Sequence, residues 1–94
     1  MNDKEIKHDT ENKQFILELE NDQIATVSYT LEGRTMHLVY SEVPPVFLGQ
    51  GVGKELVEKT FEKLTNEGFE AIAVCSYIRA IAMRSPKWSE IISV

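Results

Sequence analysis

Three glycines at alternate positions lie between a pair of prolines and the clearest amphipathic helix of the chain, in the order Pro44-Pro45, Gly49, Gly51 and Gly53. Prolines lack the N–H groups that a strand ladder needs, so the preceding strand must end there. The first turn of the following helix has amide N–H groups without intrahelical acceptors, and the helix dipole makes this end partly positive. Glycine has no Cβ, so the backbone can approach an anion closely. The segment therefore predicts a strand-to-helix junction that binds phosphate, with Lys54 adding positive charge at its edge.

Before this junction the apolar pattern predicts three strands, over residues 15–20, 24–31 and 36–43. In the second of these, Ala25, Val27 and Tyr29 share one face, because side chains alternate along a strand. The short turn between the first two strands makes them a β-hairpin. Gly33 supplies a second turn, since it can adopt positive φ. Residues 1–13 are polar, and we expect them to be partly flexible.

After the junction the pattern changes to helix, strand and helix. Residues 51–66 form the clearest helix, because apolar residues recur at helical spacing. This stripe consists of Val52, Leu56, Val57, Thr60, Phe61 and Leu64. The apolar run over residues 69–75 suits a buried strand, Ser76 fits the N-cap of a second helix, and Pro86 fits the start of a final short turn. The predicted order is β-β-β-α-β-α in one α+β domain over residues 1–94, with a mostly antiparallel sheet and one parallel crossover.

Charge and composition narrow the range of partners. The chain has 94 residues and a net charge of −5, and phosphate backbones recruit basic surfaces, so we do not expect nucleic acid as a partner. No apolar run approaches membrane-spanning length and the polar start lacks a signal-peptide core, so we expect a cytoplasmic protein without membrane contact. We expect a monomer or a weak dimer. The single cysteine, Cys75, permits no internal disulfide, and with His8 and His37 as the only histidines we expect no metal site.

Three nucleotide-binding motifs compete for the glycine loop. A Walker A motif requires four residues between its first glycine and its Gly-Lys pair, but only three separate Gly49 from Gly53. A dinucleotide fingerprint requires a glycine where Lys54 stands, and the chain is too short for a doubly wound sheet. The acetyl-CoA loop of the GNAT superfamily, Gln/Arg-x-x-Gly-x-Gly/Ala, matches at Gly51 and Gly53, with Leu48 in the opening position. The alternative is a glycine-rich helix entry without a ligand.

The whole segment 43–53 resembles the strand-to-helix segment of GNAT (GCN5-related N-acetyltransferase) proteins, with the valine, proline, aromatic and glycine positions in place. The chain is also similar to small single-domain GNAT-like proteins at shared positions that include His8, Phe15, Cys75, Tyr77 and Pro86. This resemblance implies a truncated form of the α/β three-layer-like GNAT fold, without the C-terminal strands that shape the acceptor pocket of larger members. The chain departs from the family pattern at Leu48, where arginine or glutamine is usual.

The resemblance implies acetyl-CoA as the cosubstrate. Its pantetheine arm would lie between the strands over residues 36–43 and 69–75 and bond to their backbone like an added strand. The N–H of Val43 would hold the acetyl carbonyl and stabilise the oxyanion. Arg79 and Arg84, on the second helix, either reach the phosphates or form a solvated face. The residues expected to contact the carrier are Val43, Phe47, Leu48, Gly49, Gln50, Gly51, Val52, Gly53, Lys54, Cys75 and Arg79.

The chemistry of acetyl transfer indicates three candidate catalytic residues. Glu42 is a candidate base for an amine acceptor, and Tyr77 is a candidate acid toward the departing thiolate. The alternatives are a solvent-facing strand residue and an amphipathic core residue. Cys75 could accept the acetyl group as a nucleophile, line the cofactor channel or pack as a small apolar residue. His8 and His37 are possible bases or ordinary histidines.

Three functions follow from this resemblance. The first is an N-acetyltransferase acting on a small-molecule or protein amine. The second is a non-catalytic module that binds or senses acetyl-CoA, and the third is an interaction domain that has lost the cofactor.

Overall fold

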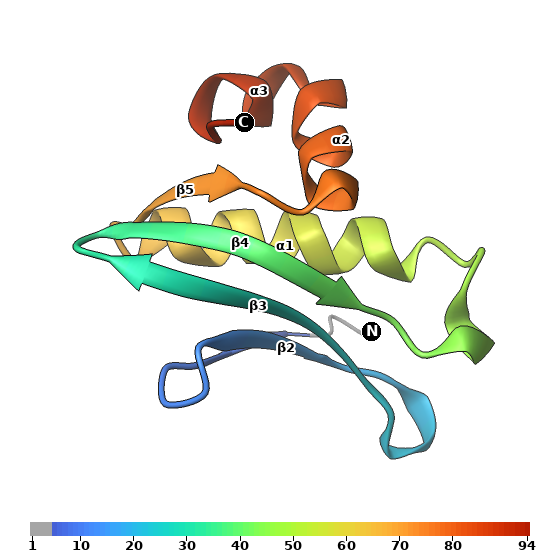
Figure 1. Ribbon diagram of the computed structural model, residues 1–94. Helices are drawn as coiled ribbons and strands as arrows, with labels where there is room; N and C mark the ends of the chain where they lie inside the picture. Colours follow the sequence, from blue (N-terminus) through green and yellow to red (C-terminus); the bar gives the residue numbers. More distant parts are fainter. Residues whose placement is uncertain (1–4) are drawn as a thin grey trace.

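The computed structural model describes residues 5–94 and shows one mixed sheet with three helices (Figure 1). The strands lie in the sheet in their chain order: β1 (Ile6–Asp9), β2 (Gln14–Glu18), β3 (Ile24–Glu32), β4 (Thr35–Glu42) and β5 (Glu70–Ala73). The helices are α1 (Val52–Asn66), α2 (Ser76–Arg84) and α3 (Pro86–Ile91), and short 3-10 turns occur at Glu20–Asp22 and Pro45–Phe47. The α+β class predicted from the sequence is confirmed.

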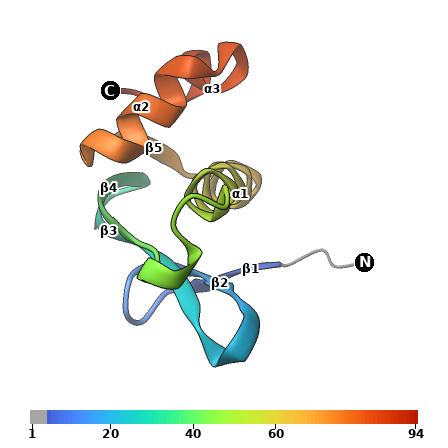
Figure 2. The ribbon, with the colours of Figure 1, turned by 90° about the vertical axis from the view of Figure 1, so that its right-hand side faces the viewer.

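The sheet is antiparallel from β1 to β4 and parallel between β4 and β5, which confirms the predicted crossover. α1 connects the two parallel strands and covers one face of the sheet (Figure 2). α2 and α3 follow β5 and lie beyond the edge of the sheet that β5 forms (Figure 1). The opposite face carries no helix of the described chain. None of the described helices is both long and apolar enough to span a membrane.

β1 lies in a segment where the sequence predicts no strand, so the observed order is β-β-β-β-α-β-α-α. Ile6 is the one large apolar residue of this strand, and its sequence therefore has no apolar alternation. β1 forms because β2 offers it a free edge, on which Ile6 pairs with Leu17 and His8 pairs with Phe15. Of the residues expected to be partly flexible, residues 1–4 lie outside the described part of the chain.

The chain leaves β5 earlier than residues 69–75 predict, and the cause is one carbonyl. The N–H groups of Val74 and Cys75 both donate to the Leu38 C=O, at 3.0 and 2.9 Å. This shared acceptor ends the regular ladder and turns the chain into α2. As a result Cys75, and not the predicted Ser76, occupies the N-cap position of that helix.

α3 and the end of the chain close the outer edge of β5. Pro86 opens α3 as predicted, and the Trp88 N–H donates to the Ser85 hydroxyl at 3.1 Å, which makes Ser85 the N-cap. The Ser93 C=O then accepts from the Ala73 N–H at 2.8 Å. The strand edge that faces away from β4 is therefore covered by the chain's own backbone.

One hydrophobic core lies between α1 and the inner face of the sheet. The stripe predicted for the helix is buried as a whole: Val52, Leu56, Val57, Thr60, Phe61 and Leu64. The sheet contributes alternate residues of its strands, including Phe15, Leu17, Ala25, Val27, Tyr29, Met36 and Leu38. Burying these residues is the main favourable contribution to folding, and it fixes α1 against the sheet.

β5 pairs along its whole length with the first half of β4 only, and the divergence beyond that point creates the candidate site. Their last pair is Leu38 with Ala73. β4 continues to Glu42 beside β3, whereas the chain after β5 turns away into α2. In addition, Tyr29 of β3 pairs with Leu38 and the preceding β3 residue pairs with Tyr40, so β4 contains a bulge at Val39. The bulge bends β4 and increases its local twist at the point where β4 leaves β5.

Candidate functional site

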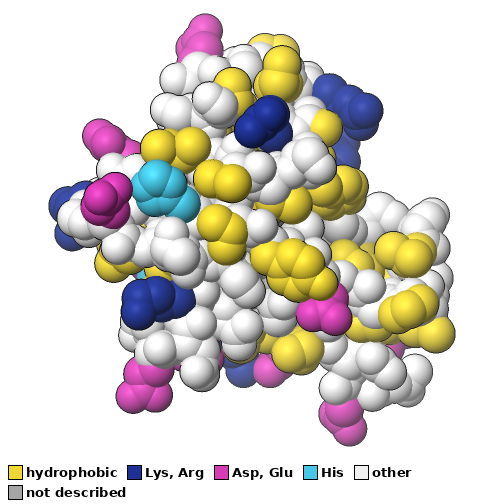
Figure 3. Space-filling view, in the orientation of Figure 1, with side chains coloured by type: hydrophobic (Ala, Val, Ile, Leu, Met, Phe, Trp, Pro, Cys, Tyr) yellow, Lys and Arg dark blue, Asp and Glu magenta, His cyan; other side chains and the backbone are white. Residues whose placement is uncertain are grey.

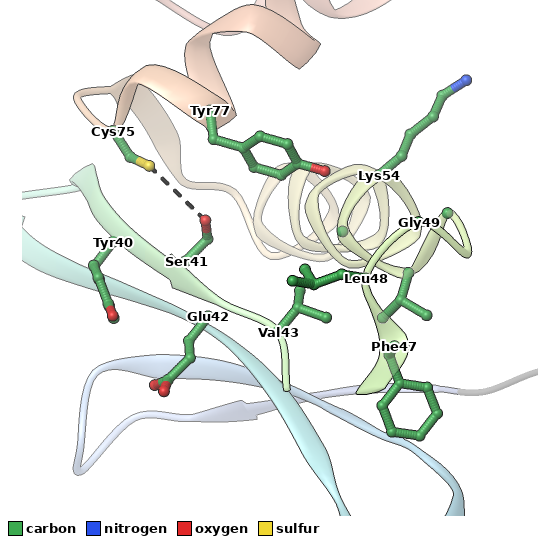
Figure 4. A pocket seen from close by; sticks show the side chains of 13 residues that line it. Tyr40, Ser41, Glu42, Val43, Phe47, Leu48, Gly49, Lys54, Cys75 and Tyr77 are labelled. Carbon is green, nitrogen blue, oxygen red and sulfur yellow. Dashed lines mark hydrogen bonds between the residues drawn. The ribbon is translucent and has the colours of Figure 1, made fainter. Parts of the chain in front are cut away.

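A cavity of about 680 Å³ occupies the opening between β4 and α2 (Figure 4). Three segments form its walls: the end of β4, the glycine loop with the first turn of α1, and the connection from β5 to α2. Its lining consists of Tyr40, Ser41, Glu42, Val43, Phe47, Leu48, Gly49, Gly51, Val52, Gly53, Lys54, Cys75 and Tyr77. This volume is in the range of cavities that hold small molecules and cofactors.

The glycine loop presents backbone to this cavity. Gly49 and Gly51 have φ angles of +81° and +79°, a region that residues with a Cβ rarely adopt. No other atom lies within 4 Å of a Cβ built on either glycine, so the space beside them is open. The first hydrogen bond of α1 joins the Glu55 N–H to the Gly51 C=O at 3.1 Å, so the N–H groups of residues 52–54 precede the helical ladder. No described side chain caps this helix end, which leaves it suited to an anion.

Gly53 has a different role from the other two glycines. A Cβ at this position would collide with the hydroxyl of Tyr77. Figure 4 shows the Tyr77 ring reaching away from Cys75 and across the first turn of α1. Gly53 therefore lets α2 pack closely over the start of α1, and Tyr77 forms a wall of the cavity above the glycine loop.

Cys75 and Ser41 face each other across the divergent strands. Their Sγ and Oγ atoms are 3.8 Å apart (Figure 4). Burial of the thiol disfavours its ionisation, but the backbone N–H groups of Ile78 and Tyr77, together with Ser41, outweigh burial and lower the pKa of Cys75 below its ordinary value of 9.0. Ser41 was not among the site residues predicted from the sequence, although it shares a strand face with Val43 two positions later. The thiol therefore lies in an environment that favours the thiolate.

The bulge at Val39 determines which way the last residues of β4 point. Met36 and Leu38 are buried against α1, so uninterrupted alternation would place Tyr40 and Glu42 on the same inner face. The extra residue reverses this order. Figure 4 shows Tyr40 and Glu42 pointing away from the cavity interior, while Ser41 points toward Cys75. Glu42 thus lies at the rim, on the outer face of the sheet.

The remaining predicted contacts divide into two groups. Val43 and Phe47 line the cavity and also pack against the core, and Leu48 lies at the cavity edge with 66% of its surface exposed. Gln50 turns back into its own loop, because its Nε2 donates to the Val46 C=O at 3.1 Å. Gln50 and Arg79 are not among the lining residues, and Arg79 is exposed on α2.

The structure places both candidate histidine bases away from the cavity. His8 lies at the other end of α1, with its Nδ1 2.7 Å from Glu67 Oε1 and its Nε2 2.6 Å from the Tyr29 hydroxyl. His37 lies in β4 with its Nε2 3.5 Å from a carboxylate oxygen of Glu32. Neither histidine lines the cavity. Among residues 5–94 no group of three His, Cys, Asp or Glu side chains could hold a metal ion.

Exposed apolar side chains border the cavity. Figure 3 shows them gathered on the sheet face that α1 does not cover. Exposed large apolar residues of β4, the glycine loop, the β5–α2 connection and the start of α2 include Val39, Tyr40, Leu48, Val74 and Tyr77. Apolar side chains therefore surround the mouth of the cavity, whereas the glycine loop presents polar backbone groups to its interior.

The candidate site is therefore a cavity between two diverging parallel strands, next to an uncapped helix that is entered through glycines. Residues 14–91 match the family profile of the GCN5-related N-acetyl-transferases, and the chain belongs to this family.

The chain is also similar to individual proteins. It is 26% identical over 83 residues to Protein NATD1 of Xenopus tropicalis, which covers 86% of this chain and 76% of that protein. It is 25% identical over 83 residues to Protein NATD1 of Homo sapiens, covering 86% of this chain and 74% of that protein. The solution structure of a GCN5-like protein from Staphylococcus aureus superposes with a TM-score of 0.70 at 23% identity, over 100% of this chain and 93% of that one. This last likeness confirms the fold.

Proposed function

We propose that the chain binds acetyl-CoA in the cavity and transfers its acetyl group to an amine, which is either a small molecule or a protein. One observation carries the proposal: the open N-terminus of α1 and the thiol of Cys75 line the same cavity. An anion-binding backbone at one end and an ionisable thiol at the other match the two ends of an acyl carrier that holds a diphosphate and a thioester.

In the proposed complex the diphosphate lies on the N–H groups of the glycine loop. The pantetheine arm runs along the unpaired edge of β4, where the strand continues beyond its last pair with β5. Ser41 directs its backbone N–H toward Cys75, and Val43 follows two residues later. Residues two apart in a strand direct their N–H groups to the same side, so we expect the Val43 N–H to face the acetyl carbonyl.

We further propose that Cys75 carries the acetyl group between donor and acceptor. Its thiolate would attack the thioester carbonyl, with the Val43 N–H holding the oxyanion, and the CoA thiolate would leave and take up a proton. The amine would then attack acetyl-Cys75, so that a C–N bond forms and the Cys75 thiolate is released. An amine that arrives over the outer face of the sheet would lose its proton to Glu42, whose side chain lies at that rim. The Tyr77 ring reaches toward Gly53, so we expect Tyr77 to contact the carrier and do not expect it to protonate the departing thiolate.

Titration with acetyl-CoA, followed by amide NMR, tests the binding site. We expect shifts concentrated in residues 41–54 and 75–78, and no shift at millimolar acetyl-CoA would refute the site. Acetyl-CoA consumption with a panel of amines then tests the transfer, and mass spectrometry tests for acetylated Cys75. If Cys75→Ala and the unaltered protein acetylate amines at equal rates, the amine attacks the thioester directly and transfer through acetyl-Cys75 is refuted.

The second candidate is a module that binds acetyl-CoA without transferring the acetyl group. The outward direction of Glu42 favours it, because the cavity interior then has no carboxylate base facing the thioester. Binding without consumption of acetyl-CoA across the amine panel would support this alternative.

A further inference from the structure

A second cavity, of about 330 Å³, lies between the first turns of α1 and the C-terminal end of α2. Its lining consists of Lys54, Glu58, Ile81, Arg84, Ser85 and Pro86. Lys54 lines both this cavity and the one beside Cys75. The two cavities therefore meet at the residue that follows the last glycine of the loop.

One face of α2 joins the two cavities. Tyr77 lines the first cavity, and Ile81 and Arg84 line the second. These positions are four and three residues apart, so their side chains project from the same side of the helix. Seven residues of α-helix span about 10 Å. A ligand that starts on the glycine loop can therefore continue along this face of α2 to Arg84.

The side chains of Lys54 and Arg84 bring two positive charges to the second cavity. Within residues 5–94 neither Lys54 nor Arg84 has an ion-pair partner. Other cations are engaged: Lys63 pairs with Glu67 at 3.5 Å, and Lys87 lies 4.5 Å from the centre of the Trp88 ring. Two unpaired cations beside one cavity are notable in a chain with a net charge of −5. They suit a phosphate group, which arginine in particular binds through several N–H donors.

The other lining groups fit a nucleoside. Pro86 offers an exposed apolar surface to a flat base, and the largely buried Ile81 forms the apolar floor of the cavity. The Glu58 carboxylate can only accept hydrogen bonds when ionised, so it suits hydroxyl or amino groups and disfavours a phosphate at its own position. The phosphate would therefore lie toward Arg84 and Lys54.

We propose that the second cavity holds the nucleotide end of the acyl carrier, with the 3′-phosphate of CoA on Arg84 and Lys54. The inference rests on the proposed function, because it extends the same ligand beyond the glycine loop. The chain then selects free CoA thioesters over acyl carriers that lack a phosphorylated ribose.

Calorimetric titration of the full chain with acetyl-CoA and with acetyl-3′-dephospho-CoA tests the proposal. We expect the unaltered protein to bind acetyl-CoA roughly tenfold more tightly, because one charge-assisted contact to phosphate is gained. Arg84→Gln should remove this difference, whereas Lys87→Gln, which makes the same charge change three residues away, should retain it. Arg84 is exposed at the end of α2, and circular dichroism checks that both variants fold.

The possible outcomes distinguish a failure of the proposed function from a failure of the nucleotide site alone. If neither thioester binds at millimolar concentration, the proposed function fails and the nucleotide site fails with it. If both bind with equal affinity, or if Arg84→Gln retains the full preference, the carrier site stands and the assignment of the second cavity is overturned. A preference that is lost in Arg84→Gln alone supports it.

Discussion

The two ends of α1 differ in how their polar groups are bonded: the C-terminal end is closed by side chains of the sheet, and the N-terminal end is open. At the C-terminal end the side chain of His8, with only 6% of its surface exposed, lies between Glu67 and Tyr29. A carboxylate can only accept, so His8 Nδ1 donates to Glu67, and in the neutral ring Nε2 then accepts from the Tyr29 hydroxyl. Burial and the negative charges of Glu67 and Asp9 raise the pKa of Tyr29, which therefore keeps its proton.

Backbone carbonyls of the last turn of α1 and of the residues just after it accept hydrogen bonds: the Lys63 C=O accepts from the Glu67 N–H, and the Leu64 C=O accepts from the Phe69 N–H. Arg34 donates through Nε to the Gly68 C=O and through Nη2 to the Glu67 C=O, both at 3.0 Å. Its guanidinium also lies 4.5 Å from the centre of the Phe69 ring. Side chains from β1, β3 and the β3–β4 turn thus close this end and attach it to the sheet.

The N-terminal end of α1 has no such closure. It begins at a glycine without a described side-chain cap, and Lys54 beside it has no ion-pair partner among the described residues. An uncapped helix end costs stability unless water or a ligand satisfies it. The helix is therefore anchored to the sheet at its C-terminal end and open at its N-terminal end, and the open end is where we expect a ligand.

The largest expected effect comes from breaking the closed end with His8→Ala. The change removes two hydrogen bonds and the stacking on Phe15, whose ring centroid is 4.2 Å away. We expect a loss of about 2–4 kcal/mol in the free energy of unfolding, measured with urea. His37→Ala is the control, because that side chain is 30% exposed and has one contact with a Glu32 carboxylate oxygen at 3.5 Å, and it should cost less than about 1 kcal/mol. Equal losses for the two variants would show that the buried cluster does not anchor the helix.

A pair of glycine variants compares the two ends directly. Gly51 precedes α1 at φ +79° and Gly68 follows it at φ +86°, so alanine is strained at both positions and should cost about 1–2 kcal/mol in each. Only Gly51→Ala should also weaken acetyl-CoA binding, by roughly tenfold, because a methyl group then enters the anion site. Urea unfolding and calorimetry measure the two quantities. A similar loss of affinity in Gly68→Ala would contradict the assignment of the ligand to the open end.

Adding charge to the open end should sharpen the difference. Leu48 is 66% exposed at the position where the family usually has arginine or glutamine, so Leu48→Arg disturbs no buried contact. We expect acetyl-CoA to bind about three- to tenfold more tightly, through a charge-assisted contact to the diphosphate. Val46→Arg is the matched control, since Val46 is 69% exposed in the same loop and does not line the cavity. Equal gains in both variants would mean that general attraction, and not a positioned contact, is responsible.

The smallest effect concerns the protonation of Cys75. The rate of iodoacetamide alkylation against pH, read by mass spectrometry, should have its midpoint below 9.0, and Ser41→Ala should raise that midpoint. Because the folded pKa is the lower one, the stability contributed by the thiolate is present above the unfolded pKa and is lost as pH falls through the folded pKa. The same protein in urea is the control. A folded midpoint at or above the urea value would remove the support for a cysteine relay.

Much of the fold could be predicted because it depends on local patterns. The alternation of Ala25, Val27 and Tyr29 and the helical stripe from Val52 to Leu64 record which side faces a core, and both are buried as predicted. β1 could not be predicted, because its pairing with β2 is what makes Ile6–Asp9 a strand. The site shows the same limit. The glycine loop was evident from the sequence, but the direction of Glu42 depends on a bulge that appears only when β4 pairs with β3.

The sequence by itself determined the glycine bend, the amphipathic helix after it and the parallel crossover, because glycine conformation and apolar spacing are properties of neighbouring residues. Only the tertiary structure decided that Ser41 faces Cys75, that Tyr77 lies over Gly53, and that Lys54 and Arg84 border one cavity. Each of these contacts joins residues far apart in the chain, and their meeting depends on strand parity and helix packing. Spacing along the sequence does not contain that information.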